Sequence, residues 1–184
     1  MAAIYVVLGL WIAGELWLQR RTGSSADRLR DPTYFVMSLC TFGAVFAGIA
    51  VERNLEDAKI AADRTVPLLI GLVMVAFGVG LRAWAVVTLG RWFTYSVQVE
   101  EGQTVVETGP YRRLRHPSYT GMVIGIAGIG VALDNWLALA IAVVVPVAGV
   151  AIRIRVEETL LFRELGDAYR SYAARTWRLV PGVW

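Results

Sequence analysis

The chain has 184 residues, of which 57% are hydrophobic, and its mean hydropathy is +0.55. Soluble domains average about 45–50% apolar residues, so the composition predicts a membrane protein with one compact domain over residues 1–184. The net charge is only +3, and no stripe of interleaved basic and aromatic residues predicts nucleic-acid binding. A single cysteine and a single histidine exclude an intrachain disulfide framework and predict no metal centre.

Five apolar segments predict an all-α polytopic membrane protein with about five transmembrane helices. In chain order they occupy residues 2–18, 34–51, 66–89, 117–133 and 136–152. Only Asp134 and Asn135 join the last two, which predicts an antiparallel helical hairpin. Both helices of this hairpin are short for a hydrocarbon core of about 30 Å.

Two stretches outside the apolar segments carry weaker patterns. Tyr95, Val97 and Val99 alternate ahead of a Glu-Gly pair, which predicts an extended or hairpin-like stretch. The tail 157–175 places leucine and tyrosine side chains at helical spacing. This spacing predicts a C-terminal amphipathic helix that lies at the membrane interface.

The basic residues predict an orientation in the membrane. Arginines gather in three segments, 20–30, 91–115 and 153–178. The loop on the other side, 52–64, mixes basic with acidic residues. By the positive-inside rule, the N-terminus is expected outside and the C-terminus in the cytoplasm. The arginine-rich, lysine-poor composition is associated with a microbial source, so we expect an integral protein of a prokaryotic cell membrane.

Charged and small residues inside the predicted spans carry further expectations. Glu15 and Arg82 lie within apolar segments, where a charge is costly and marks a candidate site. The two side chains can pair with each other, or reach the membrane edge along their apolar stems. Gly125, Gly128 and Gly130 are expected to let helices approach closely.

Two polar stretches stand at the edges of the last two predicted spans. The stretch 108–121 holds the histidine, His116, directly before Pro117, and proline is favoured at the first position of a helix. Unpaired N–H groups at that helix start attract an anion such as a carboxylate, although arginines beside it also suit lipid phosphates. The stretch 153–158 follows the fifth span. The predicted orientation places both stretches on the cytoplasmic side.

Together the two stretches resemble the signature of the isoprenylcysteine carboxyl methyltransferase family, membrane enzymes that use S-adenosylmethionine. The resemblance covers roughly residues 88–182. It also includes the following positions: Leu161, Gly166, Tyr169, Tyr172 and the closing stretch 179–182. It implies that residues 90–182 bind the cofactor and carry catalysis, while the three spans in 1–89 shape a tunnel for the acceptor.

The resemblance also implies site residues. The cofactor-binding positions are Gly109, Pro110, Tyr111, His116 and Tyr119, and the charged groups of the cofactor add Arg115 and Glu157. The catalytic candidates are Glu157, Arg153 and Glu158. The alternative for this last set is a surface ion pair between Arg153 and Glu157, four residues apart on one helix face. The substrate-binding candidates are Arg82, Arg155 and Arg175.

The expected reaction is methyl transfer to a lipophilic acceptor that enters from the bilayer. The first candidate is the carboxylate of a prenylcysteine or a related isoprenoid acid. A phospholipid amine or a small thiol stays open, and either would need a base such as His116 or a glutamate. Two other classes stay open. One is an NADPH-dependent sterol-type reductase, since the 2′-phosphate of NADPH suits the arginines in 112–115. The other is a non-enzymatic membrane protein such as a transporter.

Overall fold

The structure is a computed structural model that describes residues 2–22, 31–55 and 58–184. Its α-helices are α1 (Ala2–Thr22), α3 (Pro32–Asn54), α4 (Thr65–Leu89), α5 (Pro117–Ala132), α6 (Trp136–Glu164) and α7 (Gly166–Ala173). Two 3₁₀ turns, η2 (Gly90–Trp92) and η3 (Gly109–Arg112), lie between α4 and α5. The described residues form no strand beyond two isolated bridges, so the all-α prediction is confirmed.

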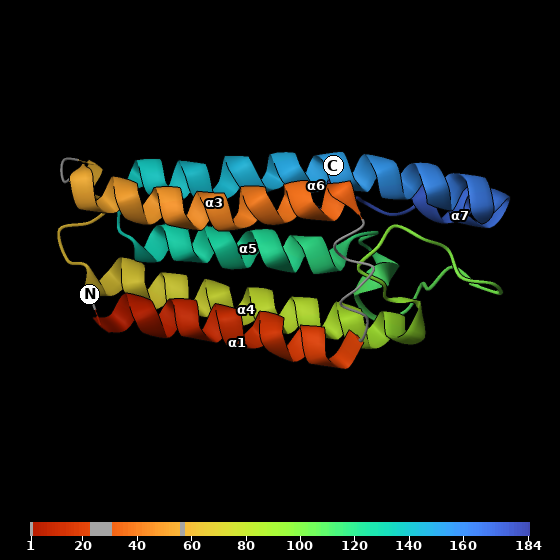
Figure 1. Cartoon of the computed structure of the whole chain (residues 1–184), viewed down its shortest axis with the longest axis horizontal. Coiled ribbons are helices and arrows are strands. Elements are labelled where there is room, and N and C mark those ends of the chain that lie inside the picture. The colour runs from red at the N-terminus through yellow and green to blue at the C-terminus, as the bar shows by residue number, and fades with distance from the viewer. Residues whose placement is uncertain (1, 23–30, 56–57) are drawn as a thin grey trace.

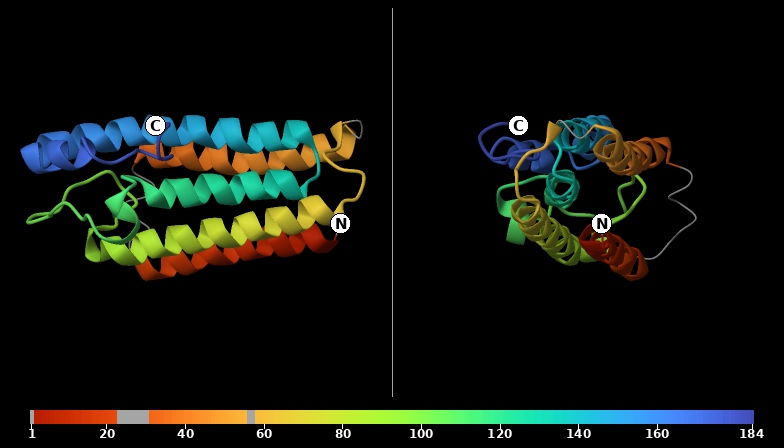
Figure 2. Two further views of the ribbon diagram at one scale, coloured as in Figure 1. Left: turned by 180° about the vertical axis from the view of Figure 1, so that it is seen from behind. Right: turned by 90° about the vertical axis from the view of Figure 1, so that its left-hand side faces the viewer.

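The long helices run alongside one another, with α5 in the middle (Figure 1). Helices α3 and α6 pack on one side of α5, and α1 and α4 pack on the other, as the end-on view in Figure 2 also shows. The turn at 134–135 lies at one end of the bundle. The stretch 90–116, the C-terminal part of α6 and α7 gather at the opposite end. This arrangement brings the two polar stretches to the same end.

The turn between α5 and α6 is the predicted hairpin. Asp134 adopts a positive φ of 56° there. The Asn135 side chain accepts hydrogen bonds from the N–H groups of Leu137 (2.9 Å) and Ala138 (3.1 Å), which caps the start of α6. Its amide also donates to the carbonyl oxygen of Leu55 (2.8 Å). One side chain therefore begins α6 and fixes the end of α3 against it.

Glycines set the close contact between α4 and α5. A Cβ atom on Gly78 would lie 2.5 Å from the carbonyl oxygen of Gly121 and 2.6 Å from the nitrogen of Gly125. A Cβ atom on Gly128 would lie 2.7 Å from a side chain of α4, and one on Gly130 would lie 2.7 Å from a side chain of α6. Small residues drive helix association in lipid because they let backbones approach, so the predicted packing role is confirmed.

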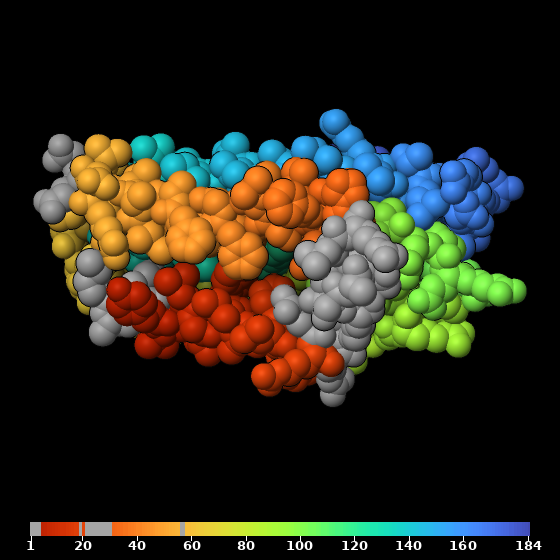
Figure 3. Space-filling view, viewed as in Figure 1, coloured from red at the N-terminus to blue at the C-terminus, as the bar shows by residue number. Residues whose placement is uncertain are grey.

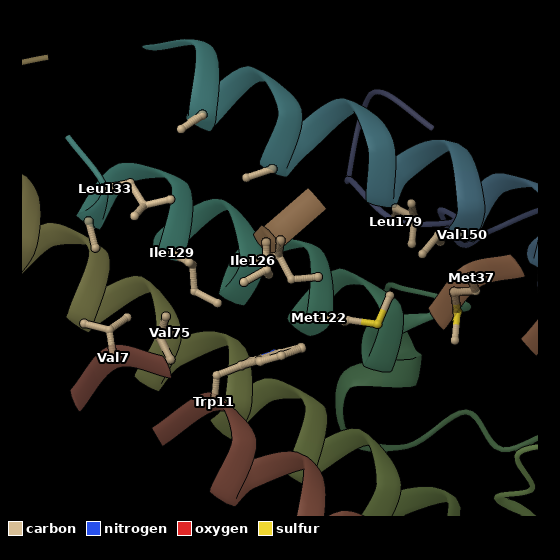
Figure 4. Close-up of a cluster of buried hydrophobic side chains, with 14 of the residues drawn as sticks. Val7, Trp11, Met37, Val75, Met122, Ile126, Ile129, Leu133, Val150 and Leu179 are labelled. Carbon is tan, nitrogen blue, oxygen red and sulfur yellow. The ribbon is translucent and has the colours of Figure 1, made fainter. Parts of the chain in front are cut away.

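The buried apolar cluster is centred on α5 (Figure 4). Ile126 and Ile129 of α5 are 0% and 1% exposed, and Val75 of α4 and Val150 of α6 are both 0% exposed. Trp11 of α1 completes the lower side of the cluster in this view. The cluster locks all the long helices around α5 and so fixes the end of the bundle that carries the polar stretches.

Figure 3 shows the face of the bundle on which α1 and α3 lie, and the outer surface of the bundle exposes many large apolar side chains. Phe46, Val73 and Val144 are between 64% and 69% exposed, which is typical of side chains that face lipid. Three helices, α3, α4 and α6, are long and apolar enough to cross a membrane, and α1 and α5 carry shorter apolar runs. The protein is therefore an integral membrane protein, while the total of five spans and the orientation stay predictions. Of the charges behind that orientation, Arg28, Arg30, Glu56 and Asp57 lie outside the described residues.

Two predictions about local structure need correction. The fifth span was expected to end at residue 152, but the helix that contains it, α6, has 29 residues and ends at Glu164. Only the apolar character ends there, since no glycine or proline follows until Gly166, whose φ of +55° stops the helix. The tail helix is thus the end of α6 followed by the short α7. The expected hairpin-like stretch has its turn at Gly102 (φ +73°) but forms no strand.

Candidate active site

The first polar stretch folds against α4 and α7. Gly109 has a φ of +56°, and a Cβ atom there would lie 3.0 Å from the Thr88 hydroxyl, so glycine suits the position on both counts. Tyr111 is buried next to it, and burial raises the pKa of its phenol. The Tyr172 hydroxyl of α7 donates to the carbonyl oxygens of Tyr111 (2.8 Å) and Leu114 (3.1 Å). These contacts hold the stretch through its backbone.

The end of the chain pairs with the same stretch. The N–H of Arg115 donates to the carbonyl oxygen of Trp177 (2.7 Å), and the N–H of His116 donates to that of Arg178 (3.1 Å). The Thr120 hydroxyl donates to the carbonyl oxygen of Leu179 (2.9 Å). This pairing places the closing residues of the resemblance directly against the histidine.

Glu158 of α6 is the charged centre of this pairing. One of its carboxylate oxygens lies 2.8 Å from Nε of Arg115 and 3.4 Å from Nε2 of His116, and the other accepts from Nε of Arg178 at 2.8 Å. Glu158 and His116 are 4% and 5% exposed. Because the guanidinium groups of Arg115 and Arg178 already contact this carboxylate, it is a buried partner that joins the two polar stretches.

The neighbouring Glu157 faces a different environment. Its carboxylate accepts a hydrogen bond from the Tyr119 hydroxyl (2.8 Å), and Nε of Arg153 donates to the same hydroxyl oxygen (2.7 Å). The Tyr119 ring stacks on His116 with centroids 5.6 Å apart. The alternative of a direct Arg153–Glu157 ion pair is therefore replaced by a bridge through Tyr119. The ion-pair partner of Arg153 is Asp31, at 3.2 Å.

Arg82 of α4 and Glu15 of α1 form another buried ion pair. Nε of Arg82 lies 2.8 Å from Oε1 of Glu15, and Nη2 donates to Oε2 at 3.2 Å. The same guanidinium donates to the Ser118 hydroxyl at the start of α5 (2.9 Å). Of the alternatives left open for these two charges, the structure shows the ion pair.

Several of these groups line one cavity. Its empty volume is about 1020 Å³, part of which is open to solvent. Helices α3, α4, α5, α6 and α7 all contribute to the wall. Residues 92–98 and 103–106 line it as well, from the stretch between η2 and η3. Both polar stretches reach this cavity.

The predicted site residues divide into two groups by position. Those that line the cavity are Tyr111, Arg115, His116, Tyr119, Arg153, Glu157 and Arg82. Those that do not are Gly109, Pro110, Glu158, Arg155 and Arg175. In the second group, Arg155 is exposed on α6, and Arg175 is exposed and pairs with Glu107.

Some residues at the site were not predicted from the sequence. Asp31 was missed, although Asp-Pro-Thr is a recognisable helix start. Ser118 and Tyr95 were missed because their contacts depend on the fold. Ser118 accepts from Arg82, and the Tyr95 carbonyl oxygen accepts from Arg153.

The sequence was next compared with known proteins. A sequence model described as phospholipid methyltransferase matches residues 66–168, which is more than half of the chain. The chain belongs to the phospholipid methyltransferase family. The match begins in α4 and ends in α7, so it contains both polar stretches.

Relatives in this family agree with the resemblance found in the sequence. The chain is 41% identical over 116 residues to protein-S-isoprenylcysteine O-methyltransferase B of Arabidopsis thaliana, covering 61% of this chain and 58% of the relative. It is 36% identical over 116 residues to the probable protein-S-isoprenylcysteine O-methyltransferase of Oryza sativa subsp. indica, covering 62% of this chain and 61% of the relative. The chain thus spans about three fifths of the length of these relatives, and the resemblance is confirmed.

A solved structure shares the fold. The eukaryotic intramembrane Ras methyltransferase, isoprenylcysteine carboxyl methyltransferase, superposes with a TM-score of 0.64 over 98% of this chain and 68% of that chain, at 19% identity. The likeness therefore extends to the N-terminal helices, which lie before the residues matched by the family model.

Proposed function

We propose that the chain transfers a methyl group from S-adenosylmethionine to a lipid-type acceptor. The acceptor we propose is the carboxylate of a prenylcysteine or a related isoprenoid acid. The observation that carries the proposal is the single cavity that both polar stretches reach, in a chain of a methyltransferase family. The similarity of the chain to protein-S-isoprenylcysteine O-methyltransferases supports this acceptor.

The cavity suits S-adenosylmethionine in its charges and its aromatic groups. The cofactor carries an ammonium group, a carboxylate, a sulfonium and an adenine ring. The Glu157 side chain is 30% exposed and lines the cavity, so it is suited to the ammonium group. Arg115 lines the same cavity and suits the carboxylate. Trp92 and Phe93 offer aromatic faces for the ring and the sulfonium.

When bound, S-adenosylmethionine supplies an electrophilic methyl group. A carboxylate acceptor is already a nucleophile, so this reaction needs no general base from the chain. The contribution of the protein is to align the two reactants and to exclude water. The bridge from Arg153 through Tyr119 to Glu157 fixes side chains from α5 and α6 along one wall. Residues 92–98 and 103–106 form another part of the wall.

We propose that the acceptor enters from the bilayer. The cavity wall includes Tyr34 and Met37 of α3 and Leu89 of α4, and both helices expose large apolar side chains on their outer faces. An isoprenoid chain would be stabilised by such a wall, in keeping with an acceptor tunnel formed by residues 1–89. The orientation that follows from the arginines has the N-terminus outside and the cavity at the cytoplasmic face.

A phospholipid amine is the second candidate acceptor, favoured by the description of the family. An amine must lose a proton during methylation, and His116 is the candidate base because it lines the cavity with Nδ1 3.9 Å from Glu157. The family match favours methyl transfer, to a carboxylate or to an amine, over the reaction of an NADPH-dependent reductase.

The test uses purified protein in lipid nanodiscs with S-adenosylmethionine carrying a radioactive methyl group. Three acceptors are supplied separately: N-acetyl-S-farnesylcysteine, phosphatidylethanolamine and a small thiol. We expect label in the farnesylcysteine product and release of that label as methanol in alkali, because a methyl ester is hydrolysed there. Label in the phospholipid alone would transfer the proposal to the amine. Absence of saturable cofactor binding by calorimetry would overturn both.

Variants connect this activity with the cavity. Glu157→Gln and His116→Ala are expected to lower cofactor affinity, because both side chains line the cavity. Asp63→Asn is the control, since Asp63 is exposed and accepts from the Thr65 N–H (2.9 Å) at the other end of the bundle. If all three variants bind the cofactor as the unmodified chain does, the cavity is not the cofactor site.

A further inference from the structure

Asp31 uses its two carboxylate oxygens for two different tasks. Oδ1 accepts from the N–H groups of Thr33 (2.9 Å) and Tyr34 (3.2 Å), which caps the start of α3. Oδ2 accepts from the N–H of Val97 (2.9 Å) and from Nη1 of Arg153 (3.2 Å). The Asp31 side chain is only 10% exposed. A single buried carboxylate thus joins α3 to α6 and to the stretch that covers the cavity.

Arg153 is held from three directions. Nε donates to the Tyr119 hydroxyl oxygen (2.7 Å), Nη1 donates to Asp31 and to the Thr33 hydroxyl (3.0 Å), and Nη2 donates to the carbonyl oxygen of Tyr95. Its side chain is 3% exposed. The guanidinium lines the cavity, but each of its nitrogens already donates to the protein. Its role in this arrangement is therefore to hold other groups in place.

The stretch 93–106, here called the covering segment, is attached to the helices at two of these points. Asp31 holds the backbone of Val97, and Arg153 holds that of Tyr95. The Tyr95 ring also contacts the Tyr34 ring edge-on, with centroids 5.6 Å apart. Both backbone attachments depend on the Asp31–Arg153 pair, because each residue of the pair holds the other and the segment.

We propose that Asp31 is a positioning residue for the methyl transfer, which orients Arg153 and fixes the covering segment over the cavity. Asp31 does not line the cavity, so it acts through these two neighbours. The inference rests on the proposed function. It assigns a role to a residue that lies 35 positions before the part of the chain matched by the family model. The charge is the required feature, since it pairs with a guanidinium that faces the cavity.

Asp31→Asn separates this role from helix capping. Asparagine caps helices about as well as aspartate, so α3 keeps its start while the charge opposite Arg153 is lost. Asp63→Asn is the matched control, because Asp63 also accepts an N–H two residues ahead at the start of a helix, α4, but is exposed and far from the cavity. A general effect of losing a carboxylate that accepts an N–H at a helix start would appear in both variants.

The first measurement is methyl transfer to the acceptor found for the unmodified chain. We expect Asp31→Asn to lower kcat about 10- to 100-fold, because small errors in alignment are costly. Asp63→Asn is expected to leave kcat unchanged. Equal kcat values in the two variants would overturn the positioning role while leaving the proposed methyl transfer intact.

The second measurement needs no turnover. Hydrogen exchange followed by mass spectrometry reports protection of backbone N–H groups in peptides from 93–106. We expect faster exchange in Asp31→Asn than in Asp63→Asn, because the Val97 N–H loses a charged acceptor. Unchanged exchange would overturn the inference even if every acceptor failed. Failure of all acceptors in the unmodified chain would count against the proposed function alone.

Discussion

Glu15 and Arg82 form an ion pair between α1 and α4, with Oε1 and Nε 2.8 Å apart. Their side chains are 18% and 6% exposed, and both lie in helices with an apolar outer surface. The pair also holds the start of α5, because Arg82 donates to the Ser118 hydroxyl (2.9 Å). The contact therefore fixes three helices beside the cavity, which Arg82 and Ser118 line.

Removal of one partner from this pair should be strongly destabilising. Glu15→Gln leaves the buried Arg82 charge uncompensated, and breaking a buried pair in this way costs about 3–5 kcal/mol. Thermal unfolding of the purified protein in nanodiscs measures the effect. In the double variant Glu15→Gln/Arg82→Gln the loss should be smaller than the sum of the two single losses. Additive losses would mean that the two charges do not interact.

Substitutions of Glu157 and of Glu158 should affect different properties of the protein. Glu158→Gln weakens contacts with Arg115, His116 and Arg178, which join the two polar stretches. We expect it to lower the unfolding temperature by several degrees. Glu157→Gln keeps a side chain that accepts from Tyr119 and removes a charge from the cavity. We expect about a tenfold or greater loss of cofactor affinity from it, the equivalent of about 1.4 kcal/mol.

Calorimetry with S-adenosylmethionine and thermal unfolding, both done on the two variants, check this division. The opposite result, with affinity lost in Glu158→Gln and stability lost in Glu157→Gln, would mean that the roles are reversed. The unmodified chain and Asp63→Asn serve as references, since Asp63 is exposed and its carboxylate contacts only the start of α4.

The sequence was sufficient for features that depend on neighbouring residues. Asn135 marks the hairpin because its side chain caps the helix that it precedes. Pro117 begins α5, as its fixed φ allows. The pairing of Glu15 with Arg82, 67 positions apart, was only one of the alternatives that the sequence left open for a charge inside an apolar span. The fold class and the common location of the two polar stretches followed from such local signals.

Contacts between distant residues were not predictable in the same way. Asp31 and Arg153 are 122 positions apart, and no pattern in the sequence connects them. The choice between Glu157 and Glu158 was open because neighbours on a helix point about 100° apart, and only the packing of α5 shows which one faces the cavity. The end of α6 was missed because a change from apolar to polar residues ends the contact with lipid without ending a helix.

Gly78 should be intolerant of a side chain. A Cβ atom there would lie 2.5 Å from the carbonyl oxygen of Gly121, so α4 and α5 would have to separate. Overpacking of this kind costs about 1–3 kcal/mol. Gly80→Ala is the matched control on the same helix, because nothing lies within 4 Å of a Cβ atom at that position.

Thermal unfolding of Gly78→Ala and Gly80→Ala compares the two sites. We expect Gly78→Ala to unfold at a lower temperature and Gly80→Ala to unfold at the same or a higher temperature, since alanine favours a helix over glycine by about 1 kcal/mol. Equal stability of the two variants would show that the α4–α5 contact is not close at Gly78.

The attachment of the covering segment through Asp31 should persist in mild acid. Burial opposes ionisation of Asp31, but hydrogen bonds from Thr33 and Val97 and the charge of Arg153 outweigh burial and hold its pKa at about 2, below the usual value of 3.8. A lowered pKa means that the carboxylate contributes its full stabilisation above pH 3.8 and loses it as the pH falls toward 2. Hydrogen exchange in peptides from 93–106, corrected for the intrinsic effect of pH, should therefore show equal protection at about pH 7 and about pH 5. A loss of protection in Asp31→Asn that is the same at both values would agree with this, whereas a loss in the unmodified chain that sets in near pH 5 would show that the pKa of Asp31 is raised instead of lowered.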